Sequence, residues 1–319
     1  MPRALPGGRQ YKRQSGLLVQ TAFAAPQFPR GFQSKTASTI FQLKNNGTWI
    51  ENLAVRSDGS LLATRIDAPE LWSIDPNANG SSSARTSIIT TFPHAMSTLG
   101  IVELTHDIFA IVVGNLSLPS VTPTPGSFNV WTVDLTGHAP CTEILARMPN
   151  ATFLDGMAKY ADNLLLLTDA AKGAVWRLNT TTGDYSPVKV GVNGIKVRKN
   201  YVYYTSSSQE VFARFPVDEN ATPTGPVEII ASGFFFDGFA LAVDGTAYLT
   251  TNPQNEVIEI SPEGRVRLLA GNQFMLVVGG STAAAIDQER SVLYVATSGA
   301  QFAPVMGRME PAKVVAIPL

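Results

Sequence analysis

The chain has 319 residues, of which 45% are hydrophobic and 15% charged, and its formal net charge is −1. This supports a sizeable core, while the near-neutral charge disfavours a basic nucleic-acid groove or an anionic membrane surface as partner. No stretch reaches the roughly 20 consecutive apolar residues of a membrane helix. We therefore expect a soluble globular protein without nucleic-acid binding or membrane insertion. The single cysteine, Cys141, excludes an intrachain disulfide or a thiolate metal cluster.

Residues 1–35 are expected to lie outside the fold. Four basic residues precede the short, interrupted apolar stretch GLLVQTAFAAP. The pattern is typical of a degenerate signal peptide, or of a flexible leader left after targeting.

Six N-x-S/T sequons are distributed along the chain, a number that favours passage through the secretory pathway. A secreted glycoprotein would carry glycans at some of Asn46, Asn79, Asn115, Asn150, Asn179 and Asn220.

An internal repeat determines the expected fold. Six segments share a small or polar pair, an apolar strand and a second β-rich run, and they lie at 51–64, 99–114, 154–169, 193–207, 237–252 and 281–299. Asp155, Asn193, Asp237 and Ser281 mark the later units, at spacings of 38, 44 and 44 residues.

Each repeat continues with further β-rich runs, such as ELWSID at 70–75 and FNVWTVD at 128–134, while long helical periodicity is absent. Four strands per unit of about 40–50 residues is typical of a propeller blade. We predict an all-β, six-bladed β-propeller with four-stranded antiparallel blades, a single domain over residues 36–319. Residues 35–43 would add the outer strand of blade six, and residues 116–127 would form a long loop.

The residue before each innermost strand should lie at one mouth of the central channel. Glu51, Asp155, Asn193, Asp237 and Ser281 are therefore predicted to converge as the catalytic set. An Asp-Gly turn that merely begins a strand would explain the sequence of one blade. It does not explain polar residues at the equivalent position of five blades.

Carboxylate and amide oxygens suit Ca²⁺ or Mg²⁺, and the absence of His and Cys from these positions disfavours zinc and copper. Without a metal, the carboxyl groups would raise one another's pKa, so that one could serve as a general acid or hydrogen-bond donor.

With Glu51, Asn193-Gly194 and Asp237-Gly238 before three inner strands, the chain resembles the gluconolactonase/regucalcin-like superfamily. The resemblance implies a divalent cation, usually calcium, on Glu51, Asn193 and Asp237. A substrate-contacting Asn-Asp-Gly of that family reads Leu154-Asp155-Gly156 here.

The segments TWIENLAVRSDGSLLAT, ELWSIDP and GIVEL resemble those of a fungal branch of these propellers, whose genes are found beside natural-product genes. Some members are similar to hetero-Diels–Alderases of tropolone–sesquiterpenoid assembly, which join a quinone methide to a terpene alkene. That resemblance implies a cofactor-independent cycloaddition in secondary metabolism.

Apolar side chains near the predicted ring fit, as a group, an apolar substrate, although each one alone is better explained as core packing. The candidate substrate-binding residues are Trp49, His94, Phe153, Phe236, Met275 and Thr282. Asp155, Asn193, Ser281 or Thr282 could donate a hydrogen bond to a substrate carbonyl. Three functions remain open: a pericyclase, a calcium-dependent lactonase or esterase, and a secreted binding propeller without catalysis.

Overall fold

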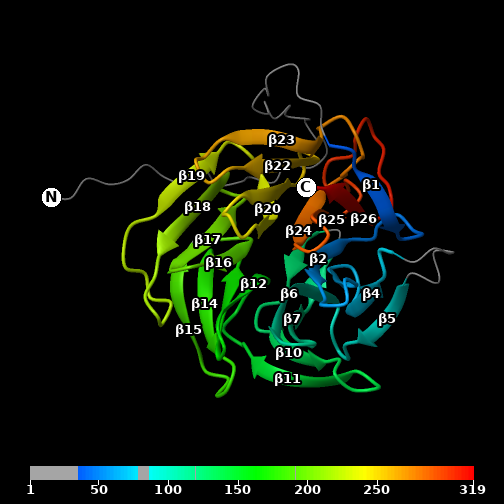
Figure 1. Ribbon diagram of the computed structural model, residues 1–319. Helices are drawn as coiled ribbons and strands as arrows, with labels where there is room; N and C mark the ends of the chain where they lie inside the picture. Colours follow the sequence, from blue (N-terminus) through cyan, green and yellow to red (C-terminus); the bar gives the residue numbers. More distant parts are fainter. Residues whose placement is uncertain (1–34, 78–85, 119, 191) are drawn as a thin grey trace.

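The computed structural model describes residues 35–77, 86–118, 120–190 and 192–319. These residues form six four-stranded antiparallel sheets arranged around a central axis (Figure 1), and no helix occurs among them. The all-β, six-bladed propeller is confirmed. The proposed leader and the sequon at Asn79 lie outside the described residues. No helix of the described chain is long and apolar enough to cross a membrane.

The first three blades follow one another along the chain. Blade one contains β2 (Ile50–Val55), β3 (Leu61–Arg65), β4 (Glu70–Ile74) and β5 (Thr86–Thr91). Blade two contains β6 (Ser97–Thr105), β7 (Ile108–Gly114), β10 (Asn129–Asp134) and β11 (Cys141–Arg147). Blade three contains β12 (Leu154–Ala161), β13 (Leu164–Asp169), β14 (Ala174–Asn179) and β15 (Tyr185–Val190).

The last three blades complete the circle. Blade four contains β16 (Ile195–Arg198), β17 (Tyr201–Ser206), β18 (Val211–Pro216) and β19 (Glu228–Ser232). Blade five contains β20 (Phe236–Leu241), β21 (Ala247–Thr251), β22 (Glu256–Ile260) and β23 (Val266–Gly271). Blade six contains β24 (Ser281–Asp287), β25 (Val292–Thr297), β26 (Lys313–Pro318) and β1 (Ser38–Gln42).

The core lies between neighbouring blades. The second strand of each blade is mostly apolar and almost entirely buried, as in β7 (IFAIVVG) and β21 (AYLTT), with threonine near its end in four blades. Both faces of such a strand are covered by adjacent blades, so it does not alternate between polar and apolar residues. The outer strands β5 and β19 are largely exposed or half-buried. Burial therefore decreases from the middle of each blade toward the rim.

Blade six closes the propeller by pairing the two ends of the described chain. Strand β1 pairs antiparallel with β26, from Ser38 opposite Ala316 to Gln42 opposite Lys313. This confirms the outer strand predicted within residues 35–43. The loop predicted at 116–127 instead contains a short hairpin, β8 (Leu116–Ser117) and β9 (Thr122–Pro123), because these residues pair with one another outside the blade.

Candidate functional site

A break in pairing recurs at the same register near the start of the innermost strands. In blade three, Leu154 pairs with Asp169 and Met157 with Leu167, so Asp155 and Gly156 together oppose the single residue Thr168. Such a two-against-one bulge bends a strand and redirects a side chain. We call the first residue of this pair the ring position. The ring positions of blades one to six are Glu51, Leu99, Asp155, Asn193, Asp237 and Thr282.

The glycine after a ring residue is required by close packing between blades. A Cβ on Gly238 would lie 2.6 Å from the carbonyl oxygen of Thr282, the ring residue of the next blade. Corresponding distances are 3.0 Å from Gly194 to the Asp237 carbonyl and 2.9 Å from Gly156 to the Asn193 carbonyl. The Asp-Gly and Asn-Gly pairs thus let the inner strands approach closely around the channel.

Threonines on the second strands hold the ring in place. Thr205 Oγ1 accepts a hydrogen bond from Gly194 N at 2.8 Å and donates to the Asp237 carbonyl at 2.6 Å. Thr250 donates to the Thr282 carbonyl at 2.9 Å in the same way. Each hydroxyl joins one blade to the ring residue of the next. The sequence reasoning missed these residues, although threonine recurs before the ends of β3, β13, β17 and β21.

Glu51 and Asp155 form a buried pair of carboxyl groups. Their side chains share a hydrogen bond, and Trp49 Nε1 donates to Glu51 Oε2 at 2.5 Å. Burial, followed by the charges of Asp155 and Asp237, raises the pKa of Glu51 well above its usual value. Burial also raises the pKa of Asp155, to about 6. Their shared hydrogen bond raises the pKa of Glu51 and lowers that of Asp155, which favours Glu51 as the donor.

Asp237 is a third carboxyl group at this site. Burial, together with the charge of Asp155, raises its pKa well above the usual value. Asn193 Nδ2 donates to Oδ1 at 3.3 Å and Asn252 Nδ2 donates to Oδ2 at 3.4 Å, which fixes the plane of the carboxyl group. Asn193 also donates to Ser207 Oγ at 2.8 Å, which orients its amide. The predicted convergence of residues from blades one, three, four and five is thus present.

Ser281 does not belong to this group, and its predicted ring position was wrong by one residue. It is fully buried, donates toward the carbonyls of Thr251 and Glu256 at 3.1 and 3.0 Å, and accepts from Thr251 N. These bonds occupy the hydroxyl. The bulge places Thr282 at the ring position, where its Oγ1 donates to the Ile50 carbonyl at 2.7 Å.

Exposed apolar side chains gather on two loops at the ring end of the channel. The loops 272–280 and 298–312 lead into β24 and β26, and Gln301 Nε2 donates to the Thr48 carbonyl just before the Glu51 strand. We call their exposed residues the apolar rim: Phe274, Met275, Val277, Phe302, Met306 and Met309. Flexible, polarizable methionines suit an irregular apolar ligand.

Trp49 connects this rim to the carboxyl ring. Its indole is buried, packs edge-on against Phe302 at a ring-centroid distance of 4.8 Å, and donates to Glu51. Of the predicted substrate-binding residues, Trp49, Met275 and Thr282 lie at this end of the channel. Val277, Phe302, Met306 and Met309 were not singled out because the loops that carry them follow no repeat.

Three other candidates lie elsewhere. Phe236 is fully buried in an aromatic cluster with Phe212 and Phe234. Phe153 is half-buried against Phe128. His94 is exposed beside an outer groove of blade two, formed with residues of β10 and β11. These positions describe core packing and the outer surface, not the ring.

The described sequons differ in exposure. Asn46, Asn150 and Asn220 are exposed, whereas Asn115 and Asn179 are half-buried. Asn179 Oδ1 accepts hydrogen bonds from the backbone of Thr181 and Thr182. Glycosylation and the secretory route stay predictions.

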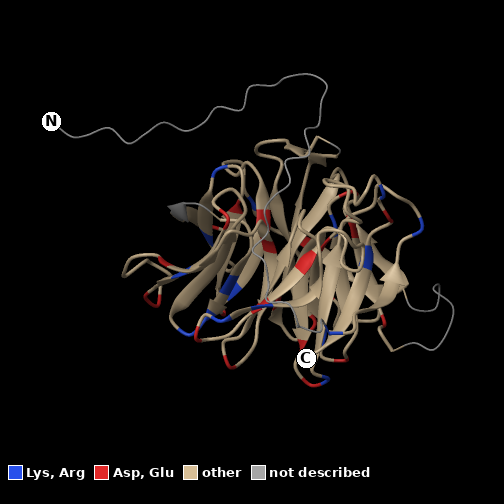
Figure 2. Ribbon diagram, turned by 90° about the horizontal axis from the view of Figure 1, so that it is seen from above, with Lys and Arg blue, Asp and Glu red and all other residues tan. Residues whose placement is uncertain are grey.

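Acidic residues also lie away from the ring, on loops at both ends of the propeller and within the strands (Figure 2). Among the described residues, only Glu103, His106 and Asp107 place three acidic or imidazole ligand atoms within 4.8 Å of one another. Asp107 is already engaged by Arg56 through two hydrogen bonds, at 2.9 and 2.8 Å. The guanidinium therefore supplies the positive charge that a cation would bring.

The curated proteins that the sequence matches share one description. No family model matches the sequence. A protein of Phoma sp named "Putative hetero-Diels-Alderase" is 24% identical, covering 78% of this chain and 83% of its own length. A protein of Sarocladium schorii with the same description is 26% identical, covering 71% and 68%. The sequence resembles curated hetero-Diels–Alderases.

Solved structures share the fold at low sequence identity. A regucalcin of Agrobacterium tumefaciens, described as a calcium-binding protein, superposes with a TM-score of 0.64 at 13% identity, covering 89% of this chain and 94% of its own. A luciferin-regenerating enzyme gives 0.67 at 12% identity, covering 90% and 96%. The expected resemblance to regucalcin-like propellers and to hetero-Diels–Alderases is confirmed.

Proposed function

We propose that the protein catalyses a cycloaddition of the hetero-Diels–Alder type in natural-product biosynthesis. The observation that carries the proposal is the occurrence of buried carboxyl groups with raised pKa values and of an apolar rim at one channel mouth, in a chain whose curated relatives are named for this reaction. A heterodiene and an alkene are both largely apolar, and the heterodiene presents one polar oxygen.

Positioning supplies most of the acceleration in this proposal. Two partners held in a reactive geometry avoid the entropic cost of a bimolecular encounter. The apolar rim takes up the hydrocarbon parts, and Phe302 and Trp49 direct them toward the ring. The reaction forms two σ bonds from π electrons and transfers no proton overall, so this chain's residues need no net acid–base step.

Asp237 is the proposed hydrogen-bond donor to the heterodiene oxygen. Its two oxygens accept hydrogen bonds from Asn193 and Asn252, and burial raises its pKa, which favours the protonated form that can donate. A hydrogen bond to that oxygen withdraws electron density from the diene and stabilises the charge that develops during bond formation. Such a donor acts strongly because the site is buried.

The test uses an o-quinone methide released in solution and an electron-rich apolar alkene. The wild-type protein should accelerate product formation and enrich one stereoisomer, with or without a chelator of divalent ions. Phe302→Ser should raise KM for the alkene more than it lowers kcat, whereas Ile229→Ser, an exposed apolar residue on outer strand β19, should change neither. A product rate and isomer ratio equal to those in buffer would refute the proposal.

A calcium-dependent lactonase or esterase is the second candidate. One observation favours it: Asn252 Oδ1 is buried and lacks a hydrogen-bond partner among the described residues, beside Asp237. Glu51, Asn193 and Asp237 would hold the ion, and this hard-oxygen set fits calcium. A bound ion would polarise a substrate carbonyl.

Calcium also distinguishes the two functions. For the lactonase, calcium should bind in the micromolar to millimolar range, raise the melting temperature and be required for ester turnover. Asp237→Leu should abolish that thermal shift, and Asp162→Leu on an exposed turn should preserve it. The cycloaddition proposal expects chelation to leave the rate unchanged.

A further inference from the structure

The loops at the two ends of the propeller differ in charge. The loops before the innermost strands, and those between the second and third strands, surround the carboxyl ring, and we call this end the ring face. Its exposed charged side chains, among the described residues, are all basic: Lys44, Lys172 and Arg308. The described acidic residues of the same loops are half-buried: Asp67, Glu210 and Glu310. Exposed charge on the ring face is therefore positive.

The opposite end of the propeller is rich in exposed acidic side chains. Loops between first and second strands carry Asp58, Asp162, Asp244 and Glu289, and loops between third and fourth strands carry Asp75, Asp184, Glu219 and Glu263. Figure 2 shows red loop tips at this end, where the C-terminus lies. In the described part of these loops the exposed bases are Lys199, Arg265 and Arg290. The formal net charge of −1 thus conceals a separation of charge between the two faces.

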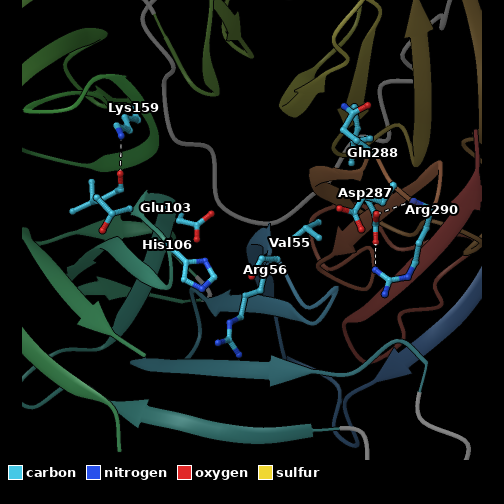
Figure 3. A pocket seen from close by; sticks show the side chains of 13 residues that line it. Val55, Arg56, Glu103, His106, Lys159, Asp287, Gln288 and Arg290 are labelled. Carbon is cyan, nitrogen blue, oxygen red and sulfur yellow. Dashed lines mark hydrogen bonds and ion pairs between the residues drawn. The ribbon is translucent and has the colours of Figure 1, made fainter. Parts of the chain in front are cut away.

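The two mouths of the channel differ in the same way. At the end opposite the ring, a cavity of about 530 Å³ is lined largely by charged side chains, among them Arg56, Glu103, Lys159 and Arg290 (Figure 3). Charges there are paired, as in the 2.7 Å contact between Arg290 and Asp287. At the ring mouth the exposed side chains include those of the apolar rim. The ring mouth is thus the apolar one of the two.

The exposed phenylalanine and methionine side chains of the described chain all lie on the ring face. Five of them belong to the apolar rim, and Met96, on the loop before blade two, is the sixth. The other large apolar side chains that are exposed are valines and isoleucines of outer strands or of the opposite face: Ile88, Val227, Ile229, Val243 and Val266. Such a concentration of large apolar side chains on one face marks an interaction surface.

A tight hairpin turn projects one of these side chains from the rim. Val305 N donates to the Arg308 carbonyl and Arg308 N to the Val305 carbonyl, both at 2.9 Å, so that Met306 and Gly307 form a two-residue turn. Both turn residues have positive φ, which is uncommon for a methionine. Met306 is 81% exposed at the tip, with Arg308 beside it.

A second turn presents Phe274 in a similar way. Phe274 N donates to Asn272 Oδ1 at 2.8 Å, and Met275 N donates to the Asn272 carbonyl at 3.0 Å. Both apolar side chains are more than half exposed. Hydrogen bonds of the backbone thus hold apolar tips outward on two separate loops of the ring face.

We propose that the ring face docks on the surface of a lipid bilayer that contains anionic phospholipids. The apolar tips lie in the interfacial layer, and Lys44, Lys172 and Arg308 face the lipid phosphates. The acid-rich opposite face is repelled by the same surface, which sets the orientation. Projecting tips suit a fluid layer that closes around them, and the basic residues match anionic headgroups. The contact is peripheral and is made by side chains of loops.

This orientation turns the channel mouth toward the bilayer. An apolar substrate dissolved in the lipid can then reach the ring without crossing water. That consequence rests on the proposed function, whereas the docking itself does not. Vesicle binding without cycloaddition would leave the docking intact, and cycloaddition without vesicle binding would refute the docking alone.

The experiment measures co-sedimentation of the full chain with sucrose-loaded vesicles. Mixed vesicles of phosphatidylcholine with about 30% phosphatidylglycerol should bind the wild-type protein more tightly than vesicles of phosphatidylcholine alone. Met306→Ser should weaken binding to mixed vesicles by at least about fivefold, because an apolar tip is lost. Val243→Ser is the matched control, since Val243 is 80% exposed on the opposite face, and it should bind as the wild type does.

A charge reversal tests the basic residues separately. Arg308→Glu should weaken binding to mixed vesicles by at least about fivefold and leave binding to phosphatidylcholine alone unchanged. Lys199→Glu, on the opposite face, should bind both vesicles as the wild type does. Equal wild-type binding to the two vesicles, no wild-type binding to either, or wild-type affinity in Met306→Ser would overturn the proposal. Absence of vesicle binding together with self-association that Met306→Ser abolishes would assign the face to a second copy of the chain.

A measurement on the wild-type protein does not depend on the stability of any variant. Mixed vesicles should slow acetylation of Lys44 by an N-hydroxysuccinimide ester, read by peptide mass spectrometry. Lys199, which is also exposed but lies on the opposite face, provides the internal control. If the vesicles leave the ratio of Lys44 to Lys199 acetylation unchanged, the proposed orientation is contradicted.

Discussion

Trp49 Nε1 donates a hydrogen bond to Glu51 Oε2 at 2.5 Å, while the same indole packs against Phe302 of the apolar rim. This contact lowers the pKa of Glu51 and so opposes the much larger effect of burial. One residue therefore couples the protonation of the ring to the surface on which an apolar ligand would lie.

Trp49→Phe should raise the pKa of Glu51 because the lowering hydrogen bond is lost. If activity requires neutral Glu51, activity declines as pH rises through this pKa, and the decline should move to higher pH in the variant. The measurement is a pH–rate profile of cycloaddition. Trp131→Phe is the matched control, since Trp131 Nε1 has no hydrogen-bond partner among the described residues. An identical profile in Trp49→Phe and wild type would argue against this contact.

Gly238→Ala should destabilise the propeller. The new methyl group would lie 2.6 Å from the Thr282 carbonyl, and backbone cannot move aside as a flexible side chain can. We expect a loss of about 1–3 kcal/mol in the free energy of unfolding, measured by chemical denaturation. Gly137→Ala, whose methyl group would meet nothing closer than 3.7 Å, should be nearly neutral. If Gly238→Ala leaves the free energy of unfolding unchanged, the close packing between these blades does not stabilise the fold.

Thr205→Val should loosen the ring residue of blade five. It removes the hydroxyl that connects Gly194 N with the Asp237 carbonyl and leaves both groups unsatisfied at this contact. Unfolding free energy should fall by about 1–3 kcal/mol. Thr132→Val, on a more exposed strand with a 3.4 Å contact, serves as the control. Equal losses in the two variants would show that the contact between blades has no special importance.

Asp155→Asn should increase stability at neutral pH. The folded-state pKa of about 6 exceeds the usual 3.8, so the folded protein binds more protons than the unfolded chain between these values. Stability therefore falls as pH rises through this window, by up to about 3 kcal/mol, and asparagine removes that loss. The gain in melting temperature of Asp155→Asn over wild type should grow from pH 4 to pH 6.5. A gain that is constant with pH would contradict the raised pKa.

The fold could be predicted because its repeat is visible in the sequence. Buried second strands recur in every blade and polar-glycine pairs in three consecutive blades, and the spacing of Asp155, Asn193 and Asp237 reflects one structural unit. The pair of residues in each bulge is less visible. Ser281 and Thr282 are both small and polar, so only the pairing of β24 with β25 decides which one occupies the ring position.

The rim is harder to predict than the ring for a physical reason. Ring residues are fixed by backbone pairing and by the close approach of blades, which restrict the sequence at each repeat. The loops 272–280 and 298–312 are not repeated, and six of their apolar side chains are exposed. Only their position relative to Trp49 indicates a common surface with Glu51.

Replacement of Asp237 by leucine tests the central claim most directly. Leucine is similar in shape but cannot donate a hydrogen bond, so the catalysed cycloaddition should slow by about 100-fold or more relative to wild type. Asp162→Leu should retain the wild-type rate, and circular dichroism should show both variants folded. A wild-type rate and isomer ratio in Asp237→Leu would contradict the claim that a ring carboxyl group activates the substrate.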